Sequence, residues 1–337
     1  MQQAVPNERA ERRLAWTRSA LADPTLQLQV ASADASFRSY WRTASADRSW
    51  IVMDAPPGKE DIVPWLDIGA RLAAAGLHTP QVHAVDHAQG FILMEDLGDA
   101  LYLPALHAGD ADALYGDALR TMLTMHAHVS PEGLPAFDEA WMVMEMDLMP
   151  EWFIGRHLGI ERDCDDWDAI EVAFRAILDA ARTQPQRFMH RDFHSRNLLV
   201  VDDNSPGVID FQGAMRGPLT YDLASLLRDC YIAWPAERVA SWREDYRRQA
   251  VALGLTDADP AGFARWFDLT GLQRHIKVLG IFCRLAYRDG KPAYLSELPL
   301  VWRYVREVGG LYDDIRPLIA LLERCIGDTD ITAARPA

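Results

Sequence analysis

The segment His190-Arg191-Asp192-Phe193-His194-Ser195-Arg196-Asn197 is followed, thirteen residues later, by Asp210-Phe211. In this pattern Asp192 is a carboxylate that can orient an alcohol and accept its proton. Asn197 and Asp210 carry the oxygen atoms that Mg²⁺ prefers as ligands. These are the groups that phosphoryl transfer from ATP to a hydroxyl requires. The sequence therefore predicts Asp192 as a catalytic base, with Asn197 and Asp210 as metal ligands.

Two β-prone runs separate Asn197 from Asp210. Residues 198–201 leave the catalytic segment, and residues 207–209 lead directly into Asp210. Runs of this length and composition, joined by a polar turn, are typical of a β-hairpin. A hairpin here would bring Asn197 and Asp210 to the same end of two paired strands.

A zinc site is the alternative interpretation of the same segment. His190 and His194 lie four residues apart, which is a metal-binding spacing on a helix. The charged Arg191 and Asp192 between them, and the β-prone flanks, favour a loop. A zinc peptidase would need a glutamate directly after the first histidine, and the residue after His190 is Arg191.

The bulk composition is that of a soluble globular protein, with 337 residues, 49% hydrophobic and 25% charged. A net charge of −15 argues against a nucleic acid or an anionic membrane as partner. Four widely spaced cysteines fit reduced thiols. Neither a signal peptide nor a transmembrane run is apparent. We therefore expect a cytoplasmic protein and, since no interface helix is apparent, a monomer.

The chain divides into a part rich in β-strands and a helical part. Strands are expected within 27–54 and at 91–94, and helices at 8–22, 61–75, 110–128, 167–183, 222–233, 236–253, 260–287 and 299–325. The polar segment 95–99, which contains a glycine, suits a hinge. The sequence predicts an α+β fold with a nucleotide-binding lobe at residues 1–98. A helical lobe at residues 99–337 would hold the catalytic loop and the substrate site.

The catalytic segment matches H-x-D-x-x-x-x-N followed by D-F, and Gly217–Leu227 matches the segment that follows it in one branch of kinase-like proteins. On these motifs the chain resembles the aminoglycoside phosphotransferase and choline kinase family over roughly residues 25–325. The resemblance implies a protein kinase-like bilobal fold, with ATP and Mg²⁺ as cofactors. It also implies that Asp222, in the Tyr-Asp-Leu-Ala helix start, fixes the catalytic loop.

A narrower resemblance is to the bacterial kinases that phosphorylate the anomeric hydroxyl of N-acetylmuramate and N-acetylglucosamine in peptidoglycan recycling. The matching blocks are residues 34–38, 52–57, 94–98, 145–153 and 273–282. They are spread over both predicted lobes, and several have no general purpose in a kinase. The resemblance implies an amino sugar and ATP as the small-molecule partners.

The phosphate-binding part departs from the kinase pattern in two places. Asp34-Ala35-Ser36-Phe37-Arg38 stands where a glycine-rich loop is expected, and it contains no glycine. The strand that ends in Met53-Asp54 lacks the lysine that V-A-I-K would supply. Charge on the phosphates must then come from Arg38 or Arg42, from Lys59, or from the metal alone.

The resemblance also assigns binding residues to both parts of the chain. The predicted nucleotide-binding residues are Ser36, Phe37, Arg38, Met53, Met94, Glu95 and Leu97. The predicted substrate-binding residues are Glu145, Asp147, Trp152, Arg191, His194, Gln212 and Arg274. Carboxylates and amides suit sugar hydroxyls, an aromatic ring suits the C–H face of a sugar, and arginine suits a carboxylate.

Two other functions remain open on the sequence alone. An aminoglycoside or amino-alcohol phosphotransferase would need several unpaired acidic residues in its pocket, which the run at residues 161–168 could provide. A non-catalytic nucleotide-binding protein would explain the missing lysine and glycines. The complete set of Asp192, Asn197 and Asp210 argues against this second alternative.

Overall fold

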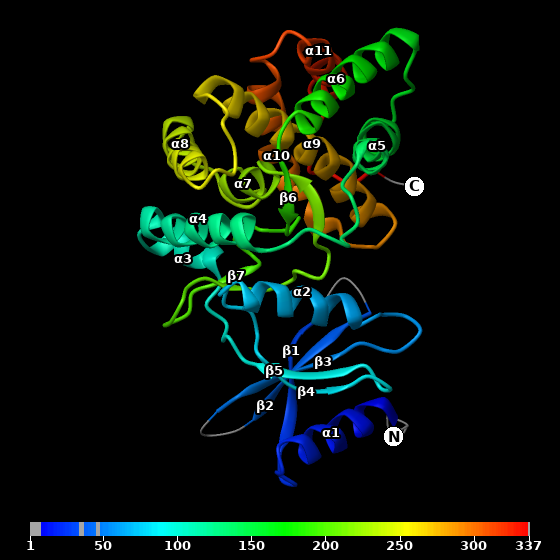
Figure 1. The fold of residues 1–337 in the computed structure, drawn as a ribbon. Coiled ribbons are helices and arrows are strands. Elements are labelled where there is room, and N and C mark those ends of the chain that lie inside the picture. The colour runs from blue at the N-terminus through cyan, green and yellow to red at the C-terminus, as the bar shows by residue number, and fades with distance from the viewer. Residues whose placement is uncertain (1–7, 34–36, 45–47, 336–337) are drawn as a thin grey trace. The chain divides into compact units, whose positions relative to one another are not determined.

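The computed structural model describes residues 8–33, 37–44 and 48–335 (Figure 1). The chain forms two compact units, Met1–Leu101 with Leu198–Gln212, and Tyr102–Asn197 with Gly213–Ala337. The first unit holds a β-sheet and the second is mainly helical. The sequence predicted one boundary at residues 98 and 99. The first unit of the structure also contains the returning segment 198–212.

The first unit is built on a five-stranded antiparallel sheet of order β1-β2-β3-β5-β4. Its strands are β1 (Gln27–Ala33), β2 (Ser39–Ala44), β3 (Trp50–Asp54), β4 (Val82–Asp86) and β5 (Phe91–Glu95). Strand β4 was not predicted, because it lies at the edge of the sheet with half-exposed side chains and lacks a clear apolar alternation.

Helix α1 (Glu8–Ala20) is attached to the sheet through the acidic residue that ends β3. The Asp54 carboxylate accepts hydrogen bonds from Arg9 Nε at 2.7 Å and from Arg13 Nη1 at 2.6 Å. Asp54 and Arg13 are both buried. A buried charge is tolerated when it is paired in this way. The acid beside the missing lysine position therefore binds α1.

The predicted hairpin is confirmed within the first unit. Strand β7 (Leu198–Leu199) pairs antiparallel with β8 (Gly207–Val208). Single bridges from His78 to Gly207 and from Leu101 to Leu199 join this hairpin to the rest of the unit. Helix α2 (Val63–Ala74) belongs to the same unit, and its Trp65 ring lies 5.1 Å from the ring of Phe211. The segment that carries Asp210 is thus packed within the unit that holds the sheet.

The second unit contains a short two-stranded sheet, β6 (Gln186–Met189) with β9 (Met215–Pro218), among helices. The helices are α3 (Tyr102–Ala108), α4 (Ala111–His128), α5 (Glu139–Met146), a π-helix (Met149–Leu158), α6 (Cys164–Arg182), α7 (Tyr221–Leu227), α8 (Ala236–Ala252), α9 (Pro260–Tyr287), a 3₁₀-helix (Pro292–Glu297), α10 (Leu298–Gly309) and α11 (Arg316–Ile326). Figure 1 shows α9 in orange among the other helices. It packs against α6, α7, α10 and the π-helix.

Aspartates start α4, α5, α6 and α9, as the sequence pattern favours. The Asp110 side chain accepts from two amides of α4, and Asp259 accepts from the Gly262 amide of α9. Asp163 and Asp166 form a reciprocal capping box at α6. The acidic run at residues 161–168 therefore begins a helix. None of the helices in the described ranges combines the length and apolarity needed to cross a membrane.

Two helix predictions were wrong in extent. Residues 299–325 form α10 and α11 rather than one helix, because Gly309-Gly310 ends the first and Arg316-Pro317 starts the second. The helix predicted at 222–233 ends at Leu227. Beyond it the chain is held by Asp229, whose carboxylate accepts from the Tyr231 amide at 3.2 Å.

Candidate active site

The catalytic segment is a loop between β6 and β7, so the helical zinc interpretation is wrong. Asp222, on the first turn of α7, holds the start of this loop. Its carboxylate accepts from the main-chain amides of His190 at 2.7 Å and Arg191 at 2.9 Å. Asp222 is buried, and charge-assisted hydrogen bonds of this kind are strong. The structural role expected for Asp222 is confirmed.

A second buried aspartate holds the middle of the loop. Asp229 Oδ2 accepts from the Ser195 amide at 3.0 Å and from the Ser195 hydroxyl at 2.5 Å. Both residues are fully buried. Sequence reasoning missed Asp229. The only available signal was an acidic residue seven positions after Asp222, in a segment that otherwise reads as an apolar helix.

Arg191 and Asp210 both adopt left-handed backbone conformations, with φ of 78° and 62°. Residues with a side chain rarely adopt this region, which costs energy unless the surroundings fix it. For Arg191 the surroundings include the bond from its amide to Asp222. Such strain is concentrated at functional sites, and here it coincides with residues chosen from the sequence motif.

Asp192 lies among basic groups of the helical unit. Its burial disfavours the charged carboxylate, but Lys277, His194, Arg274 and Arg191 together lower the Asp192 pKa. The carboxylate is therefore ionised at neutral pH, as a proton acceptor must be. The main-chain carbonyl of Asp192 accepts from Asn197 Nδ2 at 2.9 Å and from the His194 amide at 3.1 Å.

Glu145 is buried and surrounded by donors. Its Oε1 atom accepts from Arg191 Nη2 at 2.6 Å and lies 2.9 Å from Lys277 Nζ. Trp141 Nε1 and Gln273 Nε2 donate to the same carboxylate, each at 3.3 Å. Burial raises the Glu145 pKa, but the two cations outweigh it and lower the pKa. Glu145, predicted as a sugar ligand, therefore holds Arg191 and Lys277 in place.

Lys277 was not among the predicted site residues. It lies on α9 one turn after Arg274, inside a stretch that is otherwise almost entirely buried. Two cations at this spacing in a buried helix are the signal that could have marked it, because such charges need partners. Burial lowers the Lys277 pKa, while Glu145 acts to raise it.

Arg274 and His194 belong to the same unit as Glu145 and Lys277. Arg274 is buried, and its Nη1 contacts Cys230 Sγ at 3.2 Å. Burial lowers the His194 pKa, so the ring is neutral at pH 7. The His194 ring meets Tyr231 edge-on, with ring centres 5.8 Å apart. Direct sugar contact by Arg274 or His194 stays a prediction.

In the first unit, the Asp210 carboxylate contacts Gln212 and Arg38. Gln212 Nε2 donates to Asp210 Oδ1 at 2.7 Å, and Arg38 Nη2 lies 3.8 Å from the same oxygen. The Asp210 side chain is 39% exposed and that of Arg38 12%. Arg38 therefore places a positive charge beside the carboxylate that the sequence predicts as a metal ligand. Gln212 contacts that carboxylate, and its predicted contact with the sugar stays a prediction.

The other basic candidates for the missing lysine are differently engaged. Arg42 donates to Asp96 at 2.6 Å and to Asp99 at 2.7 Å, and these bonds raise its pKa. Lys59 Nζ lies 4.6 Å above the Phe37 ring and is exposed. Of these three basic residues, Arg38 is the one that forms an ion pair with Asp210 among the described contacts.

The predicted adenine-binding residues lie at the end of β3 and along β5. Met53 pairs with Ile92 and Ile51 pairs with Met94, so Met53 and Met94 share one face of the sheet. Both methionines are buried. The Glu95 amide donates to the Gln81 carbonyl at 2.9 Å.

The remaining predicted nucleotide residues are at loops. Leu97 is half-buried, and Phe37 is exposed, with its amide donating to Glu60 at 3.1 Å. Ser36 lies outside the described residues. Nucleotide contact by any of these residues stays a prediction.

The segment 141–153 lies on α5 and the start of the π-helix. Asp147 is exposed and lines an open groove of about 820 Å³ with Met144 and Glu151. Partial burial and the neighbouring Glu151 raise the Asp147 pKa. Trp152 is half-buried against the core. Substrate contact by Asp147 or Trp152 stays a prediction.

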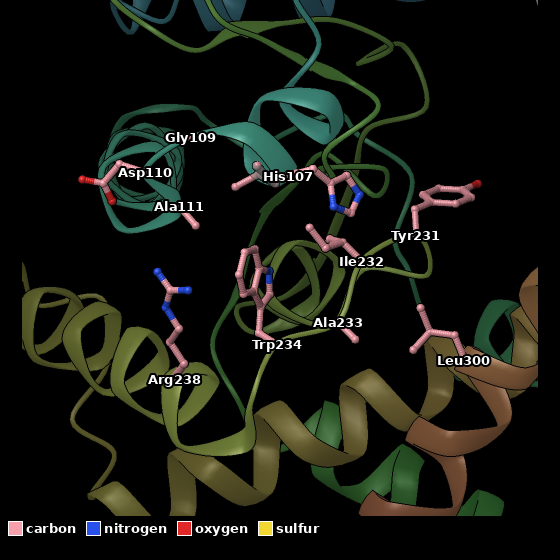
Figure 2. Close-up of a pocket in the computed structure, with 11 residues that line it drawn as sticks. His107, Gly109, Asp110, Ala111, Tyr231, Ile232, Ala233, Trp234, Arg238 and Leu300 are labelled. Atoms are coloured by element: carbon pink, nitrogen blue, oxygen red, sulfur yellow. The ribbon is translucent and has the colours of Figure 1, made fainter.

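A second cavity in the helical unit, of about 550 Å³, lies between α3, the start of α4 and the 231–238 segment (Figure 2). Its volume is within the range of small-molecule sites. Figure 2 shows Tyr231 and Trp234 on its wall, together with Arg238. Arg238 stacks over Trp234 at 4.7 Å and is paired with Asp112. Tyr231 links this cavity to the catalytic loop through His194.

Asn197 and Asp210 are chemically suited to magnesium, because an amide oxygen and a carboxylate are hard ligands. Donation from Asn197 Nδ2 to the Asp192 carbonyl fixes which end of the amide is nitrogen. Asp210 is partly exposed, so its carboxylate is accessible. Within the described ranges, no cluster of three or more His, Cys, Asp or Glu residues could hold a metal by itself. The oxygen chemistry of each side chain fits a cation that takes its other ligands from phosphate and water.

The fold is shared with several solved structures. An ethanolamine kinase from Plasmodium vivax superposes with a TM-score of 0.63 at 12% identity, covering 90% of this chain and 91% of that one. An ADP-bound aminoglycoside phosphotransferase superposes with a TM-score of 0.58 at 16% identity, covering 90% and 99%. At these identities the likeness concerns the fold, and it confirms the predicted kinase-like α+β class.

Sequence comparison gives the family. The model of the phosphotransferase enzyme family matches residues 27–264. A Pseudomonas putida protein named N-acetylmuramate/N-acetylglucosamine kinase is 41% identical over 303 residues, which cover 89% of this chain and 88% of that protein. A Neisseria meningitidis protein of the same name is 38% identical over 94% of this chain and 96% of its own length. The chain therefore belongs to the phosphotransferase enzyme family, as a relative of the N-acetylmuramate/N-acetylglucosamine kinases.

Proposed function

We propose that this protein is an ATP- and Mg²⁺-dependent kinase that phosphorylates the anomeric hydroxyl of N-acetylmuramate, N-acetylglucosamine or both, in the recycling of cell-wall sugars. The observation that carries the proposal is identity of 38–42% to three proteins of that name over 84–94% of this chain. The catalytic loop that the sequence predicted is part of the described structure, held by Asp222 and Asp229.

Asp192 is the proposed proton acceptor. An anomeric hydroxyl is more acidic than an ordinary alcohol, so an ionised carboxylate is an adequate base for it. The basic groups around Asp192 keep its carboxylate ionised. Asp192 would accept a hydrogen bond from the hydroxyl and take its proton as the phosphoryl group is transferred.

Asn197 and Asp210 are the proposed ligands of magnesium, which when bound neutralises charge on the phosphates. The support is the spacing of the two residues in sequence and the oxygen chemistry of their side chains. The Asp192 carbonyl orients the Asn197 amide, and Gln212 holds the Asp210 carboxylate. This chain's own part is thus to present two oriented oxygen ligands.

Arg38 is the proposed phosphate-binding cation in place of the missing β3 lysine. We expect Arg38→Gln to weaken ADP binding about 10- to 100-fold, the effect of losing a charged hydrogen bond, and to leave adenosine binding unchanged. Isothermal titration calorimetry with adenosine, AMP and ADP measures the loss phosphate by phosphate. Arg38 is assigned this role because its Nη2 atom lies 3.8 Å from Oδ1 of Asp210, the proposed metal ligand.

Arg12→Gln is the matched control for Arg38→Gln, because Arg12 is an exposed arginine of the same unit that pairs with Glu8. It should bind ADP as the wild type does. If Arg38→Gln also binds ADP normally while Lys59→Gln does not, then Lys59 is the phosphate cation and the assignment to Arg38 is wrong.

The aminoglycoside or amino-alcohol alternative needs unpaired carboxylates around the acceptor. Glu145, which pairs with Arg191 of the catalytic loop, already has two cationic partners. The acidic run at 161–168 caps α6, and Asp166 pairs with Arg324. These contacts favour a sugar over a polycation. The non-catalytic alternative is disfavoured by the family to which the chain belongs.

A panel of acceptors tests the proposed function. The protein is incubated with ATP, Mg²⁺ and each of N-acetylmuramate, N-acetylglucosamine, kanamycin and choline, and ADP release is measured. We expect turnover of one or both N-acetyl sugars and none of kanamycin or choline. Turnover of kanamycin without that of the N-acetyl sugars would reject the proposal. ADP binding with no transfer to any acceptor would support the non-catalytic alternative.

A further inference from the structure

One carboxylate in the helical unit is shared by two cations. Arg191 Nη2 and Lys277 Nζ both approach the same oxygen of Glu145, at 2.6 and 2.9 Å. The other Glu145 oxygen accepts from the neutral side chain of Gln273. The group of three therefore carries two positive charges and one negative charge. Two cations beside one buried carboxylate need further polar or anionic partners.

Asp192 is a further anion near these cations, and Lys277, Arg274 and Arg191 all act on its carboxylate. That carboxylate keeps its charge when it accepts a hydrogen bond from the acceptor hydroxyl, so the case for a ligand anion depends on the donors that Arg191 leaves unused. Asp222 and Asp229 direct their carboxylates to main-chain amides of the loop.

Arg191 has donor capacity that its contacts do not use. Glu145 takes a hydrogen bond from Nη2 only, while Trp141 lies beneath the guanidinium at 5.6 Å from ring centre to Cζ. Among the described residues no acceptor is found for the buried Nε atom. The Arg191 side chain is 26% exposed, so part of the guanidinium is accessible to a ligand. A planar guanidinium with a free edge is suited to a carboxylate.

We propose that Arg191 binds the carboxylate of an acidic acceptor sugar, and that Glu145 and Lys277 position its guanidinium. This inference rests on the proposed function. N-acetylmuramate carries a carboxylate on a short ether arm, whereas N-acetylglucosamine has a hydroxyl at that carbon. The Arg191 and Asp192 charges act on one another, so a sugar whose anomeric hydroxyl meets Asp192 would bring its carboxylate arm near the guanidinium. Arg191 is thus the residue by which the enzyme distinguishes N-acetylmuramate from N-acetylglucosamine.

The three residues have different parts in this arrangement. Arg191 makes the contact with the acceptor. Glu145 fixes the guanidinium in direction, because the Glu145 side chain is itself held by Trp141 and Gln273. Lys277 contacts the same Glu145 oxygen as Arg191 does. The single negative charge of Glu145 is therefore divided between two cations and does not fully neutralise Arg191. Lys277 is therefore a positioning residue whose charge acts through Glu145.

The test uses three acceptors that differ at one group: N-acetylmuramate, its methyl ester, and N-acetylglucosamine. The ester keeps the shape of the acid and removes its charge. For the wild-type enzyme we expect kcat/KM to be about 10- to 100-fold higher for the acid than for the ester, the range of a charged hydrogen bond. The difference should lie in KM, because the carboxylate is remote from the reacting atoms.

Two variants locate the effect. Arg191→Gln should remove the preference for the acid over the ester, while kcat for N-acetylglucosamine changes much less than KM for N-acetylmuramate. Lys277→Gln should reduce the same preference in part, and Lys277→Arg should restore it. The control is Arg175→Gln, which removes an exposed arginine paired with Glu171 on α6. It should leave the preference at the wild-type value.

The outcomes separate this inference from the proposed function. If the wild-type enzyme phosphorylates neither N-acetyl sugar, the proposed function fails. If it phosphorylates both, but uses the ester as well as the acid, no residue reads the carboxylate and the inference fails. It fails equally if Arg191→Gln and Lys277→Gln keep the preference of the wild type. Should Arg191→Gln not fold, Lys277→Gln and the ester comparison still decide.

Discussion

Replacing Asp192 by asparagine is expected to lower turnover by about 10²- to 10⁴-fold, the range for a lost general base. Asparagine has nearly the same size and keeps one oxygen, but it cannot take the proton of the acceptor. Loop contacts should survive, because Asn197 and the His194 amide bond the Asp192 main chain, not its side chain. The measurement is single-turnover phosphoryl transfer to N-acetylglucosamine at saturating ATP.

Two controls make the Asp192→Asn result specific. Calorimetric affinity for ADP should be retained, since Asp192 is proposed to contact the acceptor. The exposed Asp179, which pairs with Arg182 on α6, provides the matched substitution Asp179→Asn with wild-type turnover. If Asp192→Asn turns over at the wild-type rate, Asp192 has no part in the chemistry.

Asp222→Ala is expected to lower the free energy of unfolding by about 2–6 kcal/mol, because two buried amides each lose an acceptor worth about 1–3 kcal/mol. The amides of His190 and Arg191 have the Asp222 carboxylate as partner at 2.7 and 2.9 Å. Arg191 also has a left-handed backbone, with φ of 78°, so the loop should relax once the bond is lost. Urea unfolding followed by circular dichroism measures the change.

The loss in Asp222→Ala should extend to function, since the relaxed loop no longer orients Asp192. Asp179→Ala is the control for stability, because both partners of that pair are exposed and such pairs contribute about 0–1 kcal/mol. A loss below about 1 kcal/mol in Asp222→Ala would show that the two amides find other partners. The loop would then not depend on α7.

The loop and the hairpin that carry the proposed catalytic and metal-binding residues could be predicted because their signals are local in sequence. Asp192 and Asn197 belong to one loop, and the hairpin that separates Asn197 from Asp210 has a recognisable β-prone pattern. The helices predicted at 110–128, 236–253 and 260–287 correspond to α4, α8 and α9. Local pattern and motif therefore account for the loop and for most of the elements that support it.

The partners of those residues could not be predicted, because they are distant in sequence. From the sequence alone Glu145 is a carboxylate available to a ligand. In the structure it is paired with Arg191 and Lys277, which are far from it along the chain. Arg42 reads as a phosphate ligand until Asp96 and Asp99 are found to hold it. Pairing decides whether a charge is available to a ligand, and pairing depends on the tertiary structure.

The acid at the end of β3 illustrates the same limit. Asp54 lies next to the position where a kinase pattern would have a lysine, which makes it look like a degenerate nucleotide site. In the structure it binds Arg9 and Arg13 of α1. The departure from the pattern has a structural explanation within the first unit, so it is no evidence against catalysis.

The position of the phosphate on the product tests the central claim most directly. The wild-type protein is incubated with ATP, Mg²⁺ and N-acetylglucosamine, and the product is examined by phosphorus and proton NMR. Phosphate coupled to the anomeric proton, with loss of the reducing end, is the predicted result. Phosphate on the primary hydroxyl, with the reducing end intact, would contradict it.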